Sequence, residues 1–90
     1  MINKTGREKN ISSWLNHSSI LTCQATGNPR PEIIWSKGGQ ELFRGSTTGN
    51  ITIKPQKESD FGIYTCLSRN VVESDLFEVY VTRTGKNGFF

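Results

Sequence analysis

The sequence predicts an all-β chain folded as a sandwich of two antiparallel sheets. Three features of its 90 residues point to this fold class. Short stretches alternate apolar and polar residues, as half-buried strands do, and helical spacing of apolar residues is absent. Clusters of Gly, Pro, Asn and Ser separate these stretches and predict turns. Hydrophobic residues make up only 33% of the chain, which allows a single, thin core.

The first half of the chain divides into strands and turns in this way. Residues 18–25 and 32–37 alternate and are expected to form strands, and residues 26–31 form a turn rich in glycine and proline between them. Gly38 and Gly39 predict a tight reversal, because glycine adopts positive φ without steric cost.

The second half continues the pattern. A short segment begins at Leu42, and residues 45–50 are expected to form a polar loop because they combine glycine with Ser, Thr and Asn. Residues 50–54, 61–69 and 76–82 alternate again and are expected to be strands. The chain therefore has room for about seven short strands.

Residues 11–82 are expected to form one domain. Residues 1–10 are polar and lack periodicity, so they are interpreted as a lead-in or linker, and residues 83–90 as a C-terminal linker or tail. The net charge of +3 comes from these two ends, so no nucleic-acid-binding face is predicted. No apolar run is long enough to insert into a membrane, and if the protein is secreted we expect its signal peptide to lie outside this chain.

The two-residue period of a strand allows one set of side chains to share a core. The residues expected to point inward together are Leu21, Cys23, Ile33, Trp35, Ile51, Ile53, Tyr64 and Cys66.

Two motifs resemble a known family. Cys23, Trp35 and Cys66 stand in the order and spacing of an immunoglobulin domain. The run from Asp60 to Cys66 places Tyr64 two residues before the second cysteine, as in the tyrosine corner of that family. The chain therefore resembles the immunoglobulin superfamily, and specifically its intermediate (I-set) branch, which occurs in cell-adhesion molecules and receptor ectodomains.

The similarity to the I-set branch covers residues 14–82 and is densest over residues 25–37. In the family's lettering it implies strands A, B, E and D in one sheet, facing strands C, F and G in the other. It also implies a disulfide between Cys23 and Cys66 that joins the sheets, with Trp35 packed against it and the Tyr64 hydroxyl bonded to upstream backbone.

Several positions depart from the family pattern. Ser19 and Gln56 stand where an inward apolar residue is usual, so a looser sandwich is expected there. Glu73 replaces a frequent glycine and predicts a longer or differently shaped turn. Trp14 is expected to be the only buried anchor of the first strand.

Asp60 has two structural roles open to it. Its carboxylate can accept hydrogen bonds from the backbone of the corner, or it can pair with Arg44 across the base of the sandwich. Both roles maintain the fold.

Catalytic and metal-binding interpretations have little support. Free thiols or metal ligands remain open for the two cysteines, but two Cys and one distant His do not supply the four ligands of a zinc site. His17 adjoins Ser18 and Ser19, yet neighbours on a strand project to opposite faces, so it is expected to be an exposed residue. We expect no enzyme activity and no cofactor.

Four Asn-x-Ser/Thr sequons make N-glycosylation a candidate modification. They begin at Asn3, Asn10, Asn16 and Asn50, whereas Asn28 is excluded because proline follows it. All four are expected in linkers or turns, where a sugar can project into solvent.

The register that places the core inward places Ile34, Ile63, Leu67 and Tyr80 outward on one face. We interpret this face as a protein-binding surface, rimmed by charged residues; the alternatives are that a neighbouring domain or a sugar covers it, or that these are ordinary strand formers.

The expected function is that of a non-enzymatic module in an extracellular or cell-surface protein of greater length, acting in adhesion or receptor recognition. Its partners would be a second copy, a receptor or ligand protein, and neighbouring domains of its own chain. The alternative is a structural I-set domain of an intracellular cytoskeleton- or muscle-associated protein.

Overall fold

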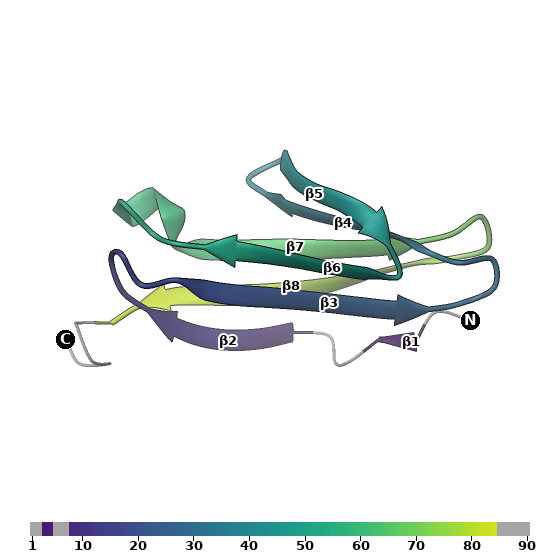
Figure 1. Cartoon of the computed structure of the whole chain (residues 1–90), viewed down its shortest axis with the longest axis horizontal. Helices are drawn as coiled ribbons and strands as arrows, with labels where there is room; N and C mark the ends of the chain where they lie inside the picture. Colours follow the sequence, from purple (N-terminus) through teal and green to yellow (C-terminus); the bar gives the residue numbers. More distant parts are fainter. Residues whose placement is uncertain (1–2, 5–7, 85–90) are drawn as a thin grey trace.

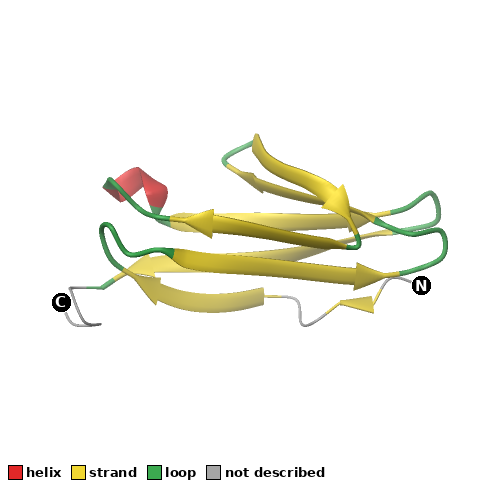
Figure 2. Ribbon diagram, viewed as in Figure 1, coloured by secondary structure: helices red, strands yellow, loops and turns green. Residues whose placement is uncertain are grey.

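Two β-sheets face each other in the computed structural model, which describes residues 3–4 and 8–84 (Figure 1). The smaller sheet has the strand order β1-β3-β6, with β1 at Asn3–Lys4, β3 at Ser19–Thr26 and β6 at Thr48–Ile53. The larger has the order β2-β8-β7-β4-β5, with β2 at Glu8–Ser13, β8 at Ser74–Arg83, β7 at Gly62–Arg69, β4 at Glu32–Lys37 and β5 at Gln40–Ser46. One short 3-10 helix, Glu58–Asp60, interrupts the otherwise all-β part of the chain that the structure describes (Figure 2).

Strict alternation in β3 and β7 builds the core between the sheets. In β3, Leu21, Cys23 and Ala25 are buried while the residues between them are exposed. The antiparallel pairing of β4 with β7 sets Trp35 directly opposite Cys66, and both side chains are fully buried. The core cluster is completed by Ile33, Ile53, Tyr64, Phe77, Val79 and Val81. The expected inward set is therefore buried, except that Ile51 is only partly so.

The reversal predicted at Gly38 and Gly39 joins β4 to β5. The two residues have φ angles of 58° and 83°, a pair of left-handed conformations that a tight hairpin requires. β4 ends at Lys37 and β5 begins at Gln40, so the turn contains no other residue.

The prediction of a polar loop over residues 45–50 is wrong. β5 extends to Ser46, β6 begins at Thr48, and only Thr47, with a φ of 62°, lies between them. The glycines of this segment serve packing instead. A Cβ at Gly45 would stand 2.8 Å from the ring of Phe43, and one at Gly49 would stand equally close to it.

The predicted division of strands between the sheets is also wrong in part. The expected fourth strand of the smaller sheet is absent from the described residues, and β5 pairs instead with β4 at the edge of the larger sheet. The physical reason is the connection: Thr47 alone leads from β5 into β6, so no length of chain remains to form another strand beside β6.

Strands also occupy part of the expected N-terminal lead-in. β1 pairs with β3, and β2 runs parallel to β8 over its whole length. At the other end, the backbone N–H of Thr84 donates to the carbonyl oxygen of Ser13 at 2.8 Å, whereas residues 85–90 of the expected tail lie outside the described residues. The exact domain boundaries stay a prediction.

The departures from the family pattern have local explanations. Trp14 is only half-buried, and its ring stacks on that of His17 with 3.9 Å between the centroids. Ser19 is partly buried opposite Ile53, and Gln56 is exposed. Glu73 closes a turn that Asn70 organises, because the Asn70 side-chain oxygen accepts the backbone N–H groups of Val72 and Glu73, both at 2.9 Å.

The tyrosine corner is formed. The Tyr64 hydroxyl donates to the carbonyl oxygen of Asp60 at 2.5 Å, and the Asp60 carboxylate accepts the backbone N–H groups of Gln56 at 2.8 Å and Lys57 at 3.3 Å. Of the two roles open to Asp60, the pairing with Arg44 is wrong, since Arg44 binds Glu32 and Glu41.

These contacts perturb the pKa of Asp60. The hydrogen bond from Gln56 lowers it most, the bond from Lys57 and the charges of Lys57 and Lys37 lower it further, and partial desolvation opposes them. The result is a pKa below the ordinary value for this carboxyl group.

Tyr64→Phe should destabilise the fold by about 1–3 kcal/mol, because it removes a buried donor and leaves the Asp60 carbonyl short of a partner. Urea denaturation of both proteins measures the loss. Tyr80→Phe is the matched control, since it removes a hydroxyl from the outer face of the same sheet and should cost less. Equal losses for the two variants would contradict a special role for the corner.

Asp60→Asn should reduce stability at neutral pH more than in acid. A carboxyl whose pKa is lower in the folded state contributes fully above its unfolded pKa of about 3.9, and this contribution is lost as the pH falls through the folded pKa. The difference in urea midpoint between wild type and variant should therefore shrink between pH 6 and pH 2. A difference that stays constant over this range would show that the charge of Asp60 does not stabilise the corner.

Candidate protein-binding face

The outer face of the larger sheet carries two apolar rows that run across its strands. In the first, which we call the leucine row, Leu76 of β8 lies opposite Leu67 of β7, and Leu67 lies opposite Ile34 of β4. In the second, the tyrosine row, Tyr80 of β8 lies opposite Ile63 of β7. The four residues expected on one face are therefore placed on one face, distributed over these two rows.

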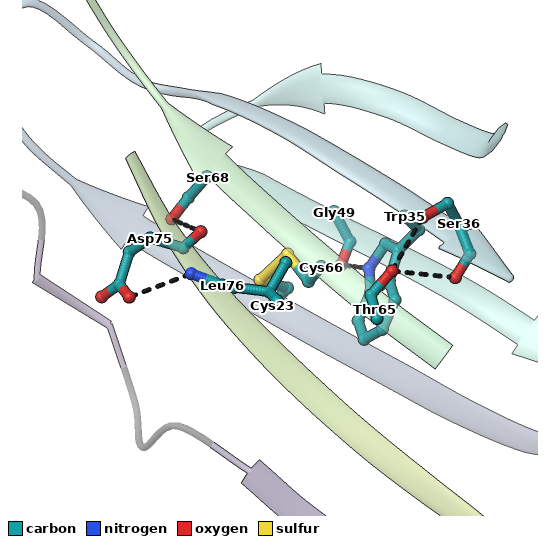
Figure 3. The surroundings of a disulfide bond; sticks show 9 residues. All are labelled: Cys23, Trp35, Ser36, Gly49, Thr65, Cys66, Ser68, Asp75 and Leu76. Carbon is teal, nitrogen blue, oxygen red and sulfur yellow. Dashed lines mark hydrogen bonds between the residues drawn. A yellow bond between two sulfur atoms is a disulfide. The ribbon is translucent and has the colours of Figure 1, made fainter. Parts of the chain in front are cut away.

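A polar row separates the leucine row from the tyrosine row. Thr65 of β7 lies between Ser36 of β4 and Glu78 of β8, and its hydroxyl is 2.8 Å from that of Ser36 (Figure 3). The apolar side chains consequently form two strips instead of the single contiguous group that the sequence suggested.

Exposure differs sharply along these rows. Ile34 was expected to be exposed but is buried, at 9%. It sits mid-sheet, opposite Leu67 on one side and Arg44 on the other, and the Arg44 guanidinium forms ion pairs with Glu32 and Glu41. Leu67 is half-buried.

Leu76 is 48% exposed and belongs to the site, although the sequence-based set omitted it. The signal was available, because Leu76 has the same parity as Tyr80 along the strand. Ile63, at 44%, is the most exposed member of the tyrosine row, and Tyr80 is half-buried.

Charged residues frame one end of the leucine row. Glu32 accepts hydrogen bonds from Arg44 and, at 3.2 Å, from Arg69, and Arg44 also pairs with Glu41 at 2.7 Å. The hydrogen bond from Arg44 is the largest cause lowering the pKa of both carboxyls. The four side chains are substantially exposed, so the network contributes little to stability, but it fixes their positions beside the apolar strip.

The sequons are distributed differently from the expectation. Asn10 and Asn50 are exposed strand residues of β2 and β6, and only Asn16 lies in a turn, with a φ of 67°. Asn3 lies in β1, and its side chain is outside the described part. Asn10 is the strand neighbour of Tyr80, so a sugar there would flank the tyrosine row.

The disulfide predicted from the family resemblance is present. Cys23 and Cys66 are joined across the two sheets, and Trp35 lies beside them, with its indole N–H donating to the carbonyl oxygen of Gly49 at 3.0 Å (Figure 3). Neither cysteine is a free thiol in this structure.

The described part of the chain contains neither a cluster of metal-binding side chains nor a membrane-spanning helix. His17 stacks on Trp14 and belongs to no group of three or more His, Cys, Asp or Glu side chains placed to hold a metal ion. Over residues 3–4 and 8–84, no helix has the length and apolar character needed to cross a membrane.

Comparisons with known proteins agree with this geometry. A family model described as an immunoglobulin domain matches residues 5–70. The chain is 40% identical over 58 residues to a peroxidasin homolog of Homo sapiens, which covers 57% of this chain and 4% of that protein. It is 34% identical over 74 residues to vascular endothelial growth factor receptor 2 of Mus musculus, covering 76% of this chain and 6% of the receptor.

The fold is also found among solved structures. Titin domain M7 superposes with a TM-score of 0.76 at 23% identity, covering 93% of this chain and 94% of that one. The chain thus corresponds to a small fraction of the two curated relatives and to nearly all of a single solved domain. Taken with the inter-sheet disulfide, the buried tryptophan and the tyrosine corner, these matches show that the chain belongs to the immunoglobulin domain family.

Proposed function

We propose that this domain is a non-enzymatic protein-binding module of a larger cell-surface or secreted protein, and that the leucine row is its contact surface. The observation that carries the proposal is the exposed Leu76 beside Leu67 on an open sheet face. Apolar side chains in the middle of a patch with charged residues at its rim are the composition of a protein interface. No sequon neighbours the leucine row on an adjoining strand among the described residues, in contrast to Tyr80.

Three observations support an extracellular location. A disulfide persists in oxidising compartments and is rare in the cytosol. Asn10, Asn16 and Asn50 are exposed within sequons and accessible to glycosylation. A relative named as a growth factor receptor, moreover, contains a segment similar to this chain.

The second candidate is a structural domain of an intracellular filament-associated protein. The likeness to titin domain M7 favours it only at the level of the fold, since the identity is 23%. The two candidates differ in the chemistry expected of the cysteine pair, which would stay reduced in the cytosol.

Protein purified from its native source should contain no titratable thiol and should lose stability on reduction. The bond joins cysteines with a sequence separation of 43, and the loop that it closes lowers the entropy of the unfolded chain. This effect is expected to stabilise the folded state by about 4 kcal/mol. Thiol titration with and without denaturant, followed by urea denaturation with and without reductant, measures both effects. Two reactive thiols in the native preparation would favour the intracellular candidate.

Leu67→Asp should weaken association by about 1 kcal/mol or more, because it places a charge at the centre of the contact. Analytical ultracentrifugation tests association with a second copy, and beads coated with the domain test binding to a panel of cell-surface ectodomains. Ile20→Asp is the control: Ile20 is 69% exposed on β3, in the opposite sheet, so the same change of chemistry should leave binding intact. If both variants bind as wild type does, the leucine row is not the contact surface.

A further inference from the structure

A groove opens along the side of the sandwich where β6 faces β4 and β5. It encloses about 730 Å³. Leu42 and Phe43 line it from β5, and Ile51 and Ile53 line it from β6. Leu42 is 43% exposed, and Phe43 and Ile51 are half-buried against the core, so the groove presents apolar surface that the sandwich does not cover.

β6 is an edge strand along this groove. Among the described residues it pairs with β3 on one side and with no strand on the other. Strand backbone groups point alternately to the two sides, so about half of the N–H and C=O groups of β6 are directed away from β3. Such an edge is a template for another strand, and the pairing would stop at Pro55, which has no N–H to donate.

The end of the groove beside the C-terminus of β6 is positively charged. Lys37, Lys54 and Lys57 line it, and none of them forms an ion pair with a carboxylate of the described residues. The Lys37 ammonium donates to the carbonyl oxygen of Ser59 at 2.7 Å. The one acidic residue of the lining, Asp60, already accepts two backbone N–H groups.

We propose that β6 binds an extended peptide segment of another protein, which adds to the smaller sheet as its fourth strand. The segment runs antiparallel to β6, carries acidic residues at its N-terminal end, and continues with apolar residues at every second position. The acidic end lies at the C-terminal end of β6, against Lys54 and Lys57, and the apolar residues enter the groove over Leu42 and Phe43. Backbone pairing supplies affinity, and the lysines and the apolar floor supply selectivity.

Charge argues for a peptide and against a second copy of this chain as the occupant. Pairing of β6 with β6 would bring two equally basic grooves together, and lysine on an edge strand is a known obstacle to such pairing. An acidic segment is attracted by the same three lysines. This site is distinct from the leucine row, which lies on the outer face of the larger sheet.

The test uses the 90-residue chain produced without glycosylation, because Asn50 also lines the groove. The probe is a blocked heptapeptide with the sequence Asp-Glu-Val-Thr-Val-Thr-Val. Calorimetric titration should detect binding, and hydrogen exchange should show new protection of β6 amides. Two further peptides carry N-methyl groups on alternate residues: methylation of the set that faces β6 should abolish binding, whereas the other set should be tolerated.

The charge requirement is tested with protein variants. Lys54→Glu combined with Lys57→Glu should weaken binding by about tenfold at low salt, as expected for the reversal of two exposed charges. Lys9→Glu, at an exposed lysine of β2, should change it by less than twofold. The proposal is overturned if the probe does not bind at about 1 mM, which corresponds to a binding free energy near −4 kcal/mol. It is also overturned if both methylated peptides bind or if the new protection appears away from β6. Pairing of β6 between two copies of the chain would overturn it as well.

Discussion

The bond between Cys23 and Cys66 fixes the register on which the rest of the structure depends. It commits alternate residues of β3 and β7 to the space between the sheets, and a slip of one residue in either strand would turn its cysteine to solvent. Trp35 lies opposite Cys66 in the neighbouring strand and fills the space beside the bond. With those positions fixed, the parity of β4, β7 and β8 determines both the core and the outer face.

Much of this arrangement could be predicted from the sequence, because parity and the cysteine, tryptophan and tyrosine motifs are local signals. The elements that could not be predicted depend on long-range packing. Gly45 and Gly49 look like loop residues in the sequence, yet they lie in β5 and β6, where a Cβ at either position would stand 2.8 Å from the ring of Phe43. Glycine is typical both of loops and of strand positions where another group packs closely against the backbone, so the sequence alone does not distinguish the two.

The exposure of side chains on the candidate contact face also depends on long-range packing and could not be predicted from the sequence. Parity correctly indicates the direction in which Ile34, Leu67 and Tyr80 project, but it carries no information about what stands on the next strand. Ile34 is buried in mid-sheet, where it has a strand neighbour on each side, Leu67 of β7 and Arg44 of β5. Leu76 lies opposite Leu67 near the β7–β8 turn and is 48% exposed. Exposure is therefore set by neighbours across strands, and predicting it requires knowing the strand order first.

The strand order depends in part on two short connections. The turn at Gly38 and Gly39 keeps β5 beside β4, and because Thr47 alone joins β5 to β6, no further strand fits between them, so among the described residues the smaller sheet ends at β6. Compared with the predicted division of strands, the larger sheet has β5 as an additional strand beside Ile34. The smaller sheet has one strand fewer, and the groove beside Ile51 is open. The two surfaces discussed above thus have a common origin in the length of the chain between two strands. Side-chain identity then decides their character: the first carries leucines beside a network of ion pairs, and the second is lined by three lysines and a single carboxylate, Asp60. Lengthening that connection should consequently alter both surfaces together, whereas changing any single side chain alters only one.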